Sequence, residues 1–364
     1  MRERLKICVF EGDGIGPEIM APTLELLLTL AERRQLPVMD FTAMPAGAGH
    51  YRDHGVALPK TSLAAARDAD AILLSAMGLP EVRYPDGTEI SPQIELRMAL
   101  DLYAGVRPVM LFGQPTTLAG QHRLDFVIVR ESTEGLFASH GKGRLEGDAA
   151  AEETLRITRT TSEKLFDFAF NLARRRAAAG RGHGLVHCVD KANVFQAFAF
   201  FRRIFHERAA QFPDLRAEAI YVDATALWMV QQPQRFDVIV TENMFGDILS
   251  DLGAGIMGGL GFAPSADIGD DHAVFQPCHG SAPDIAGQGI ANPIAMILSA
   301  AMMLEWLGET RQDAAMLAAG GDLRVAVERV VREGRIRTPD MGGPDGTAAV
   351  CTAVGSALDL EVVG

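Results

Sequence analysis

Cysteine is scarce in this sequence. The 364 residues include four, Cys8, Cys188, Cys278 and Cys351, which lie far apart and form no CxxC pair. This spacing argues against a zinc ribbon and against a thioredoxin-like redox site. We therefore expect four reduced thiols and a cytoplasmic protein.

Long apolar segments are also missing. The N-terminal sequence MRERLKICVFEGDG has only a short apolar run before charge and glycine return. A secretory signal needs an apolar stretch of ~7–15 residues, and a membrane span needs about 18. We expect neither.

Basic residues are outnumbered, with Lys and Arg totalling 34 against 47 Asp and Glu, a net charge of −13. An acidic surface repels phosphate backbones, which argues against nucleic acid or an anionic membrane as the main partner. A local basic pocket is still compatible with this charge. Hydrophobic residues make up 48%, enough for a large core, and the length suggests about two domains.

Strands and helices alternate along the chain, which predicts an α/β fold. Continuous apolar runs predict sheet strands covered on both faces, at Leu5–Phe10, Ala71–Ser75, Phe126–Arg130 and Asp237–Thr241. Helical spacing occurs at Glu18–Glu32, Ile94–Leu102, Thr161–Ala177, Ala192–Glu207 and Ala295–Leu307. The small, polar segment Ala138–Ala151 predicts a flexible loop or an extended arm.

Two glycine-rich segments require interpretation. Gly12–Glu18 (GDGIGPE) follows a strand, but Pro17 stands where a dinucleotide fingerprint needs a small residue, so we interpret it as a tight turn. Gly253–Gly258 fits GxGxxG formally. However, helix-like sequence separates it from the preceding strand, so we interpret it as glycines for close packing.

Acidic and basic residues suggest a charged site. Asp247 and Asp251 are four residues apart, which on a helix places both carboxylates on one face; a hard divalent cation would offset their repulsion, with Asp223 as a third ligand. A solvated helix face is the alternative. Arg97, Arg107 and Arg130 flank apolar segments and could clamp a substrate with several carboxylates, or could form surface ion pairs.

Two further segments carry polar groups that could act in catalysis or bind a cofactor. Lys191, in VDKANV, could act as a base if its surroundings lower its pKa, or could be an ordinary surface lysine. The Gly- and Pro-rich segment His279–Asn292 could bind a cofactor by hydrogen bonds. Within it, Asp284 could accept both ribose hydroxyls of an adenosine and would repel a 2′-phosphate.

In combination these motifs resemble the isocitrate/3-isopropylmalate dehydrogenase family of β-decarboxylating dehydrogenases. The match follows the order GDGIGPEI, LRMALDLYAGVRPV, VRESTEG, VDKANV, YVDA, TENMFGDILSD and HGSAPDIAGQGIANP, from Gly12 to Pro293. The resemblance implies a two-domain α/β fold with a shared central sheet and a non-Rossmann cofactor site. It implies one domain of residues 1–105 plus 255–364 and a second of 106–254, with an arm near 138–160.

The resemblance also assigns roles by position in a homodimer whose active sites take residues from both subunits. It implies Lys191 and Asp223 as catalytic groups, supplied by the second subunit. Implied substrate contacts are Arg97, Arg107, Arg130, Ser91, Gln93 and Lys191. Implied cofactor contacts are Asn193, His279, Gly280, Ser281, Ala282, Asp284 and Asn292. Implied ligands of Mg²⁺ or Mn²⁺ are Asp223, Asp247 and Asp251.

The implied activity is NAD- and divalent-metal-dependent oxidative decarboxylation of a malate-type 2-hydroxy acid, resembling 3-isopropylmalate or isocitrate. Tartrate or D-malate oxidation, and a catalytically weak regulatory subunit, are alternatives. Two departures from the family bear on this. Phe137 stands where a tyrosine usually assists the last proton transfer. Either His140, His187 or water serves in its place, or the reaction is slowed, or it stops at the keto acid. The specificity segment Ile90–Ile94 mixes polar Ser91 and Gln93 with two isoleucines.

Overall fold

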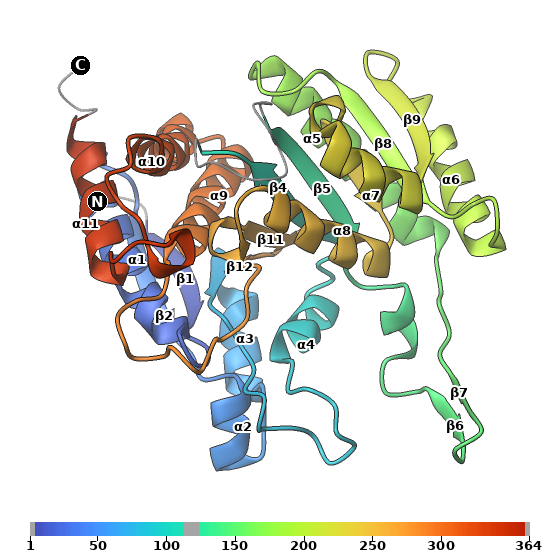
Figure 1. Ribbon diagram of the computed structural model, residues 1–364, viewed down its shortest axis with the longest axis horizontal. Coiled ribbons are helices and arrows are strands. Elements are labelled where there is room, and N and C mark those ends of the chain that lie inside the picture. Colours follow the sequence, from blue (N-terminus) through green and yellow to red (C-terminus); the bar gives the residue numbers. More distant parts are fainter. Residues whose placement is uncertain (1–3, 113–123, 361–364) are drawn as a thin grey trace.

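A ten-stranded sheet runs through the whole molecule (Figure 1). The computed structural model describes residues 4–112 and 124–360. The strand order is β2-β1-β3-β12-β11-β4-β5-β10-β8-β9. The strands are β1 (Arg4–Phe10), β2 (Val38–Ala43), β3 (Ala71–Leu74), β4 (Ala104–Met110), β5 (Asp125–Glu131), β8 (Leu185–Asp190), β9 (Arg216–Tyr221), β10 (Val238–Thr241), β11 (Pro264–Ile268) and β12 (Ala273–Pro277).

Two parallel groups of strands flank an antiparallel centre. The outer groups are β2, β1, β3 and β12 on one side and β5, β10, β8 and β9 on the other. Between them, β11 pairs antiparallel with both β12 and β4, and β4 pairs antiparallel with β5. Every residue of β3, β10, β11 and β12 is buried, as expected for strands covered on both faces.

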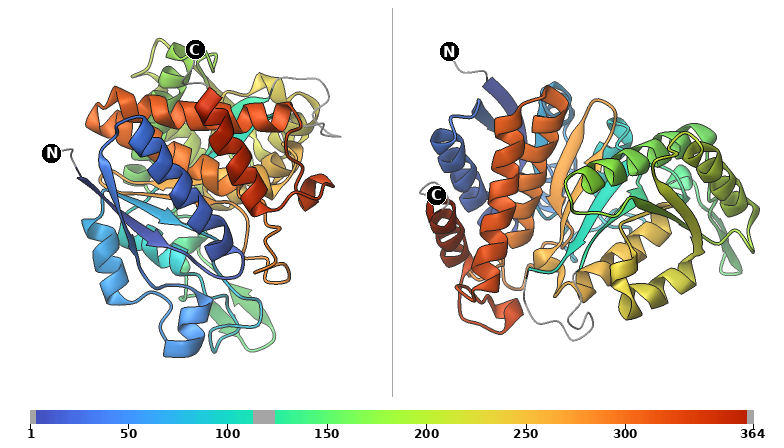
Figure 2. Two further views of the ribbon diagram at one scale, coloured as in Figure 1. Left: turned by 90° about the vertical axis from the view of Figure 1, so that its left-hand side faces the viewer. Right: turned by 90° about the horizontal axis from the view of Figure 1, so that it is seen from above.

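Helices cover both faces of this sheet (Figure 2). They are α1 (Gly16–Arg33), α2 (Ala48–His54), α3 (Lys60–Asp68), α4 (Pro92–Ala99), α5 (Arg159–Ala178), α6 (Gln196–Ala209), α7 (Val222–Gln231), α8 (Asn243–Ile256), α9 (Ile294–Arg311), α10 (Ala314–Arg332) and α11 (Thr347–Leu360). The strongly apolar α9 buries most of its residues and exposes its C-terminal end, as expected of a core helix. No helix in the described residues is long and apolar enough to cross a membrane.

The predicted strands and the predicted helices are all present, and the α/β fold is confirmed. Two helix boundaries were wrong. The helix expected from Ala192 begins only at Gln196, because a turn closes first through hydrogen bonds from the Val194 and Phe195 N–H groups to the Lys191 carbonyl. The helix expected to reach Leu102 ends at Ala99, before Asp101 adopts a positive φ of 50°.

Two other predictions concern irregular segments. The arm is a projecting hairpin of β6 (Arg144–Glu146) and β7 (Ala150–Glu152) (Figure 1). Gly253 and Gly255 lie inside α8 rather than directly after a strand, so the GxGxxG match there is not a nucleotide-binding turn. The division into residues 1–105 plus 255–364 and 106–254 stays a prediction, since one sheet is continuous across both parts.

Candidate active site

A cleft of about 400 Å³ lies beside the antiparallel centre of the sheet. It brings together the three arginines singled out in the sequence: Arg97 from α4, Arg107 from β4 and Arg130 from β5. Asp247 and Asp251 of α8 line the same cleft. All three arginines are buried, so they are not surface ion pairs.

The arginines form a buried positive cluster. Burial lowers the pKa of Arg130 to about 10, and the neighbouring Arg97 and Arg107 guanidinium groups add to this effect against the attraction of Asp247. Arg130 also donates to Asp247 and, over 2.7 Å, to Asn243 Oδ1. The Nε of Arg107 is buried without a hydrogen-bond partner. Mutual repulsion and a free donor favour binding of an anion in the cleft.

Asp267 of β11 lies at the base of this cluster, where it is fully buried. Its Oδ2 accepts from Arg97 Nε at 2.9 Å and from Gln276 Nε2 at 2.7 Å, and its Oδ1 accepts from Ser132 Oγ at 3.2 Å. Burial opposes ionisation, but Arg97, followed by the other two guanidinium groups, keeps the pKa of Asp267 below its usual value. Asp267 therefore holds the Arg97 side chain in place at the cleft.

Asp247 and Asp251 lie one turn apart on α8, as predicted. Burial, followed by the charge of Asp247, raises the pKa of Asp251. Two carboxylates that repel each other in this way suit a hard divalent cation, which would neutralise their charge. However, the described residues of one chain contain no cluster of three or more His, Cys, Asp or Glu that could hold a metal. Within the described part of one chain, these two carboxylates therefore lie together without a third acidic side chain that would complete a metal site.

Lys191 and Asp223 lie outside the described lining of this cleft. Lys191 follows β8, and its Nζ donates to Asp223 Oδ2 in the first turn of α7 at 2.8 Å. That hydrogen bond lowers the pKa of Asp223. The turn around them is fixed by buried Asp190, which accepts two hydrogen bonds from Arg202. The exposed Asn193 belongs to the same turn.

The predicted cofactor segment lies partly at the cleft. His279 and Gly280 line it, and His279 Nε2 is buried without a hydrogen-bond partner. Ser281 is buried and donates to the Gly78 carbonyl, and Ala282 takes a positive φ of 37°. The side chain of Asn292 donates to Asp340 at 3.0 Å.

Glu18 of α1 holds the predicted cofactor segment in place by hydrogen bonds. Its carboxylate accepts from the backbone N–H groups of Gly287 and Ala291 at 2.9 and 3.0 Å, and from Thr347 Oγ1 at 3.0 Å. These contacts leave Asp284, within the loop, exposed to solvent.

The cleft wall formed by the start of α4 and the segments beside it is mainly polar. Ser91, Gln93 and Glu89 line it together with Ile94 and Phe137. Gln93 Oε1 is buried and has no hydrogen-bond partner. An unpaired buried amide oxygen costs ~1–3 kcal/mol, so this wall favours a ligand with a hydrogen-bonding group.

The two histidines considered as substitutes for tyrosine at Phe137 are placed differently. The ring of His140 is 6.3 Å from that of Phe137 and edge-on to it. His187 lies in β8, outside the described cleft lining, and burial lowers its pKa to about 4. The structure therefore separates His187 from the cleft.

Sequence reasoning missed four residues that support the site: Asp267, Gln276, Asn243 and Glu18. One signal was present, because Asp267 is an acidic residue within the otherwise uncharged strand PSADI. A buried strand tolerates a carboxylate only when it is paired.

The chain was compared with known proteins. The family model described as "Isocitrate/isopropylmalate dehydrogenase" matches residues 6–358. The chain is 44% identical over 339 residues to a 3-isopropylmalate/3-methylmalate dehydrogenase of Methanocaldococcus jannaschii, covering 93% of this chain and 94% of that protein. It is 41% identical to an isocitrate/homoisocitrate dehydrogenase of Thermus thermophilus, covering 97% and 98%.

Solved structures agree with these matches. The crystal structure of an isocitrate dehydrogenase from Methylococcus capsulatus superposes with a TM-score of 0.85 at 38% identity, over 97% of this chain and 99% of that one. Members of this family are decarboxylating dehydrogenases of malate-type hydroxy acids, and they use a divalent metal and a nicotinamide cofactor. The chain belongs to the isocitrate/isopropylmalate dehydrogenase family.

Proposed function

We propose that this protein oxidises a malate-type 2-hydroxy acid with NAD and Mg²⁺ or Mn²⁺, and releases its β-carboxylate as CO₂. The observation that carries the proposal is the convergence of three buried arginines and two aspartates on one cleft. Guanidinium groups bind carboxylates with paired, charge-assisted hydrogen bonds. The cluster thus holds and orients a dicarboxylate next to the carboxylate pair of α8.

The residues of the chain divide the chemistry between them. Asp247 and Asp251 would hold the cation with Asp223 of a second subunit, and the cation would polarise the oxygen atom on C2 of the substrate. Lys191 of that subunit takes the hydroxyl proton, and NAD, when bound, would supply the acceptor for the hydride on C2. The arginines keep the carboxylates in place while the β-carboxylate leaves as CO₂ and the remaining carbanion takes a proton. With Phe137 at the usual tyrosine position, that proton comes from His140 or water.

An exposed apolar surface supports the homodimer. Leu227 on α7 and Met244 and Ile248 on α8 have exposed fractions of 52%, 41% and 62%. Neighbouring exposed apolar side chains mark interaction sites, and a two-fold dimer uses the same patch on both subunits. Because α8 also carries Asp247 and Asp251, a partner docked here would bring its own Lys191 and Asp223 towards the cleft.

Asp284 supports NAD over NADP. Its carboxylate is exposed on a loop that Glu18 holds in place. A carboxylate there can accept from the ribose hydroxyls and repels a 2′-phosphate. The assay should give a kcat/KM with NADP far below that with NAD. Comparable values would refute the cofactor assignment.

The polar wall around Gln93 bears on the substrate. We infer a substituent that can hydrogen-bond with the Gln93 amide, in preference to the isopropyl group of 3-isopropylmalate. The hydroxyl of tartrate can donate to Oε1, and the carboxylate of isocitrate or homoisocitrate can accept from the Nε2 group. An alkyl group buried against Gln93 Oε1 would leave that oxygen without a hydrogen bond, which costs ~1–3 kcal/mol of binding free energy. Gln93→Leu should therefore shift kcat/KM towards 3-isopropylmalate, with Gln211→Leu, at an exposed position, as the control.

NADH formation at 340 nm tests the proposal directly. The panel contains isocitrate, homoisocitrate, 3-isopropylmalate, tartrate and D-malate with Mn²⁺, and CO₂ is trapped in parallel. Turnover of one member with stoichiometric CO₂ supports the proposal. Silence across the panel combined with measurable binding of one acid supports the alternative, a regulatory subunit, which Phe137 favours.

A further inference from the structure

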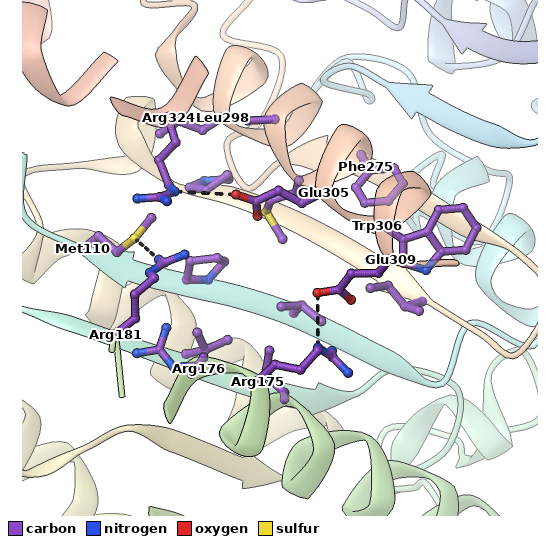
Figure 3. A pocket seen from close by; sticks show the side chains of 18 of the residues that line it. Met110, Arg175, Arg176, Arg181, Phe275, Leu298, Glu305, Trp306, Glu309 and Arg324 are labelled. Carbon is purple, nitrogen blue, oxygen red and sulfur yellow. Dashed lines mark hydrogen bonds and ion pairs between the residues drawn. The ribbon is translucent and has the colours of Figure 1, made fainter. Parts of the chain in front are cut away.

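We propose a second ligand site on the opposite face of the sheet, which binds a small monocarboxylate with an apolar body. The site is a cavity of about 140 Å³ between α5, α9 and α10 (Figure 3). An apolar cavity of ~150 Å³ takes up benzene, so this one has room for a small ring or a short chain. Nothing in the proposed dehydrogenase reaction uses it.

The cavity and the substrate cleft are separated by the sheet itself. Side chains alternate between the two faces of a strand. On β4, Arg107 points to the cleft whereas Val106 and Pro108 line the cavity; on β12, Gln276 and Phe275 divide in the same way. The two sites therefore share strands but no described lining residue.

Apolar side chains gather at one end of the cavity, beside the ion pair of Arg175 and Glu309 (Figure 3). Trp306 and Phe275 lie together there, with ring centroids 5.9 Å apart, and Phe168 and Leu172 of α5 complete the apolar lining. A short alkyl or phenyl group that displaced water from this end would gain hydrophobic free energy.

The other end carries guanidinium groups with poor partners (Figure 3). Arg181 donates to the thioether of Met110 at 3.2 Å and to Asp125 Oδ2 at 3.5 Å. Thioether sulfur is a weak acceptor. Arg324 Nε is buried without a hydrogen bond, 3.6 Å from Glu305 Oε1.

A carboxylate would satisfy these donors. The neighbouring Arg176, by contrast, is engaged by Asp237 at 2.8 Å and Asp125 at 3.0 Å, which leaves Arg181 and Arg324 as the binding groups. Burial, followed by the charge of Arg324, lowers the pKa of Arg181. Asp125 and Glu305 already offset part of this shift, but the pKa of Arg181 stays lowered. One further negative charge between the two arginines would relieve the repulsion that is left. The geometry fits a carboxylate at the arginine end and an apolar group at Trp306.

Phenylacetate is the test ligand, and isothermal titration calorimetry of the full chain is the measurement. We expect saturable binding of phenylacetate, at least about tenfold weaker binding of the isosteric amide phenylacetamide, and quenching of Trp306 fluorescence. Arg181→Gln and, separately, Arg324→Gln should each weaken phenylacetate binding about tenfold or more, as expected for a lost charge-assisted contact.

Two control variants distinguish binding in this cavity from binding elsewhere on the protein. Arg174→Gln removes an exposed arginine of α5 that pairs with Asp214 and should leave phenylacetate binding unchanged. Arg130→Gln disables the substrate cleft and should also leave it unchanged. The proposal is overturned if phenylacetate does not bind, if phenylacetamide binds equally well, if neither cavity variant weakens binding, or if Arg130→Gln abolishes it. Because the readout is binding, failure of the dehydrogenase assay would not affect this result.

Discussion

Replacing Asp267 with asparagine tests the electrostatic design of the cleft. The substitution Asp267→Asn would keep the shape of the side chain but remove the negative charge in contact with Arg97, whose Nε lies 2.9 Å from the carboxylate. Both partners are buried. Removing one member of a buried ion pair costs about 3–5 kcal/mol, because the other charge stays desolvated and unpaired. We expect a loss of unfolding free energy of this size at pH 7.

The pH dependence of that loss follows from the pKa of Asp267. Its folded-state pKa is held below the usual value, so the carboxylate stabilises the fold fully above its unfolded pKa of about 3.9. The stabilisation disappears as the pH falls through the lower, folded-state pKa. The difference in unfolding free energy between the wild type and Asp267→Asn should therefore be constant at neutral pH and should shrink below about pH 4.

Urea unfolding at pH 7 and at several pH values below 4, followed by circular dichroism, measures both quantities. Asp40→Asn is the matched control, because Asp40 pairs with Arg4 on the surface and exposed pairs contribute little. If Asp267→Asn destabilises the protein no more than Asp40→Asn does, the buried pair does not have the role assigned to it.

Three further outcomes follow from the site. Asp251→Asn should weaken Mn²⁺ binding, titrated by electron paramagnetic resonance, by more than the about 10–100-fold typical of losing a supporting contact; unchanged affinity would exclude Asp251 as a ligand. Glu18→Gln should raise the KM for NAD with little change in kcat, because it weakens the hydrogen bonds that hold the loop at Gly287 and Ala291; a fall in kcat alone would contradict a positioning role. Phe137→Tyr should raise turnover if proton transfer to carbon limits the reaction, and an equal or lower rate would show that His140 or water suffices.

Strands and helices were predictable here because their signals are local. Buried runs such as Phe126–Arg130 carry their own hydrophobic pattern, and the two aspartates of α8 lie four residues apart in one helix. The end of α4 and the start of α6 were not, since a positive φ at Asp101 and a turn at Lys191 override helical spacing. Such turns depend on single residues and on contacts made after folding.

The residues of the candidate site were predictable only from the order of motifs along the chain, which matches that of a known family. Spacing alone left Arg97, Arg107 and Arg130 open as surface ion pairs, and their convergence requires one helix and two strands to come together in the fold. Asp267 and Glu18 act through partners 170 and 273 residues away in sequence. No local pattern encodes contacts of that kind.

Mixing two inactive variants tests most directly whether the active site is shared between subunits. Asp251→Asn removes a cleft ligand, and Asp223→Asn removes the group assigned to the partner. In a mixed dimer one cleft would lack both groups and the other would be intact, so a 1:1 random mixture should recover about a quarter of wild-type activity. If Asp223 served the cleft of its own chain, each site in the mixed dimer would carry one defect, and the mixture would stay inactive.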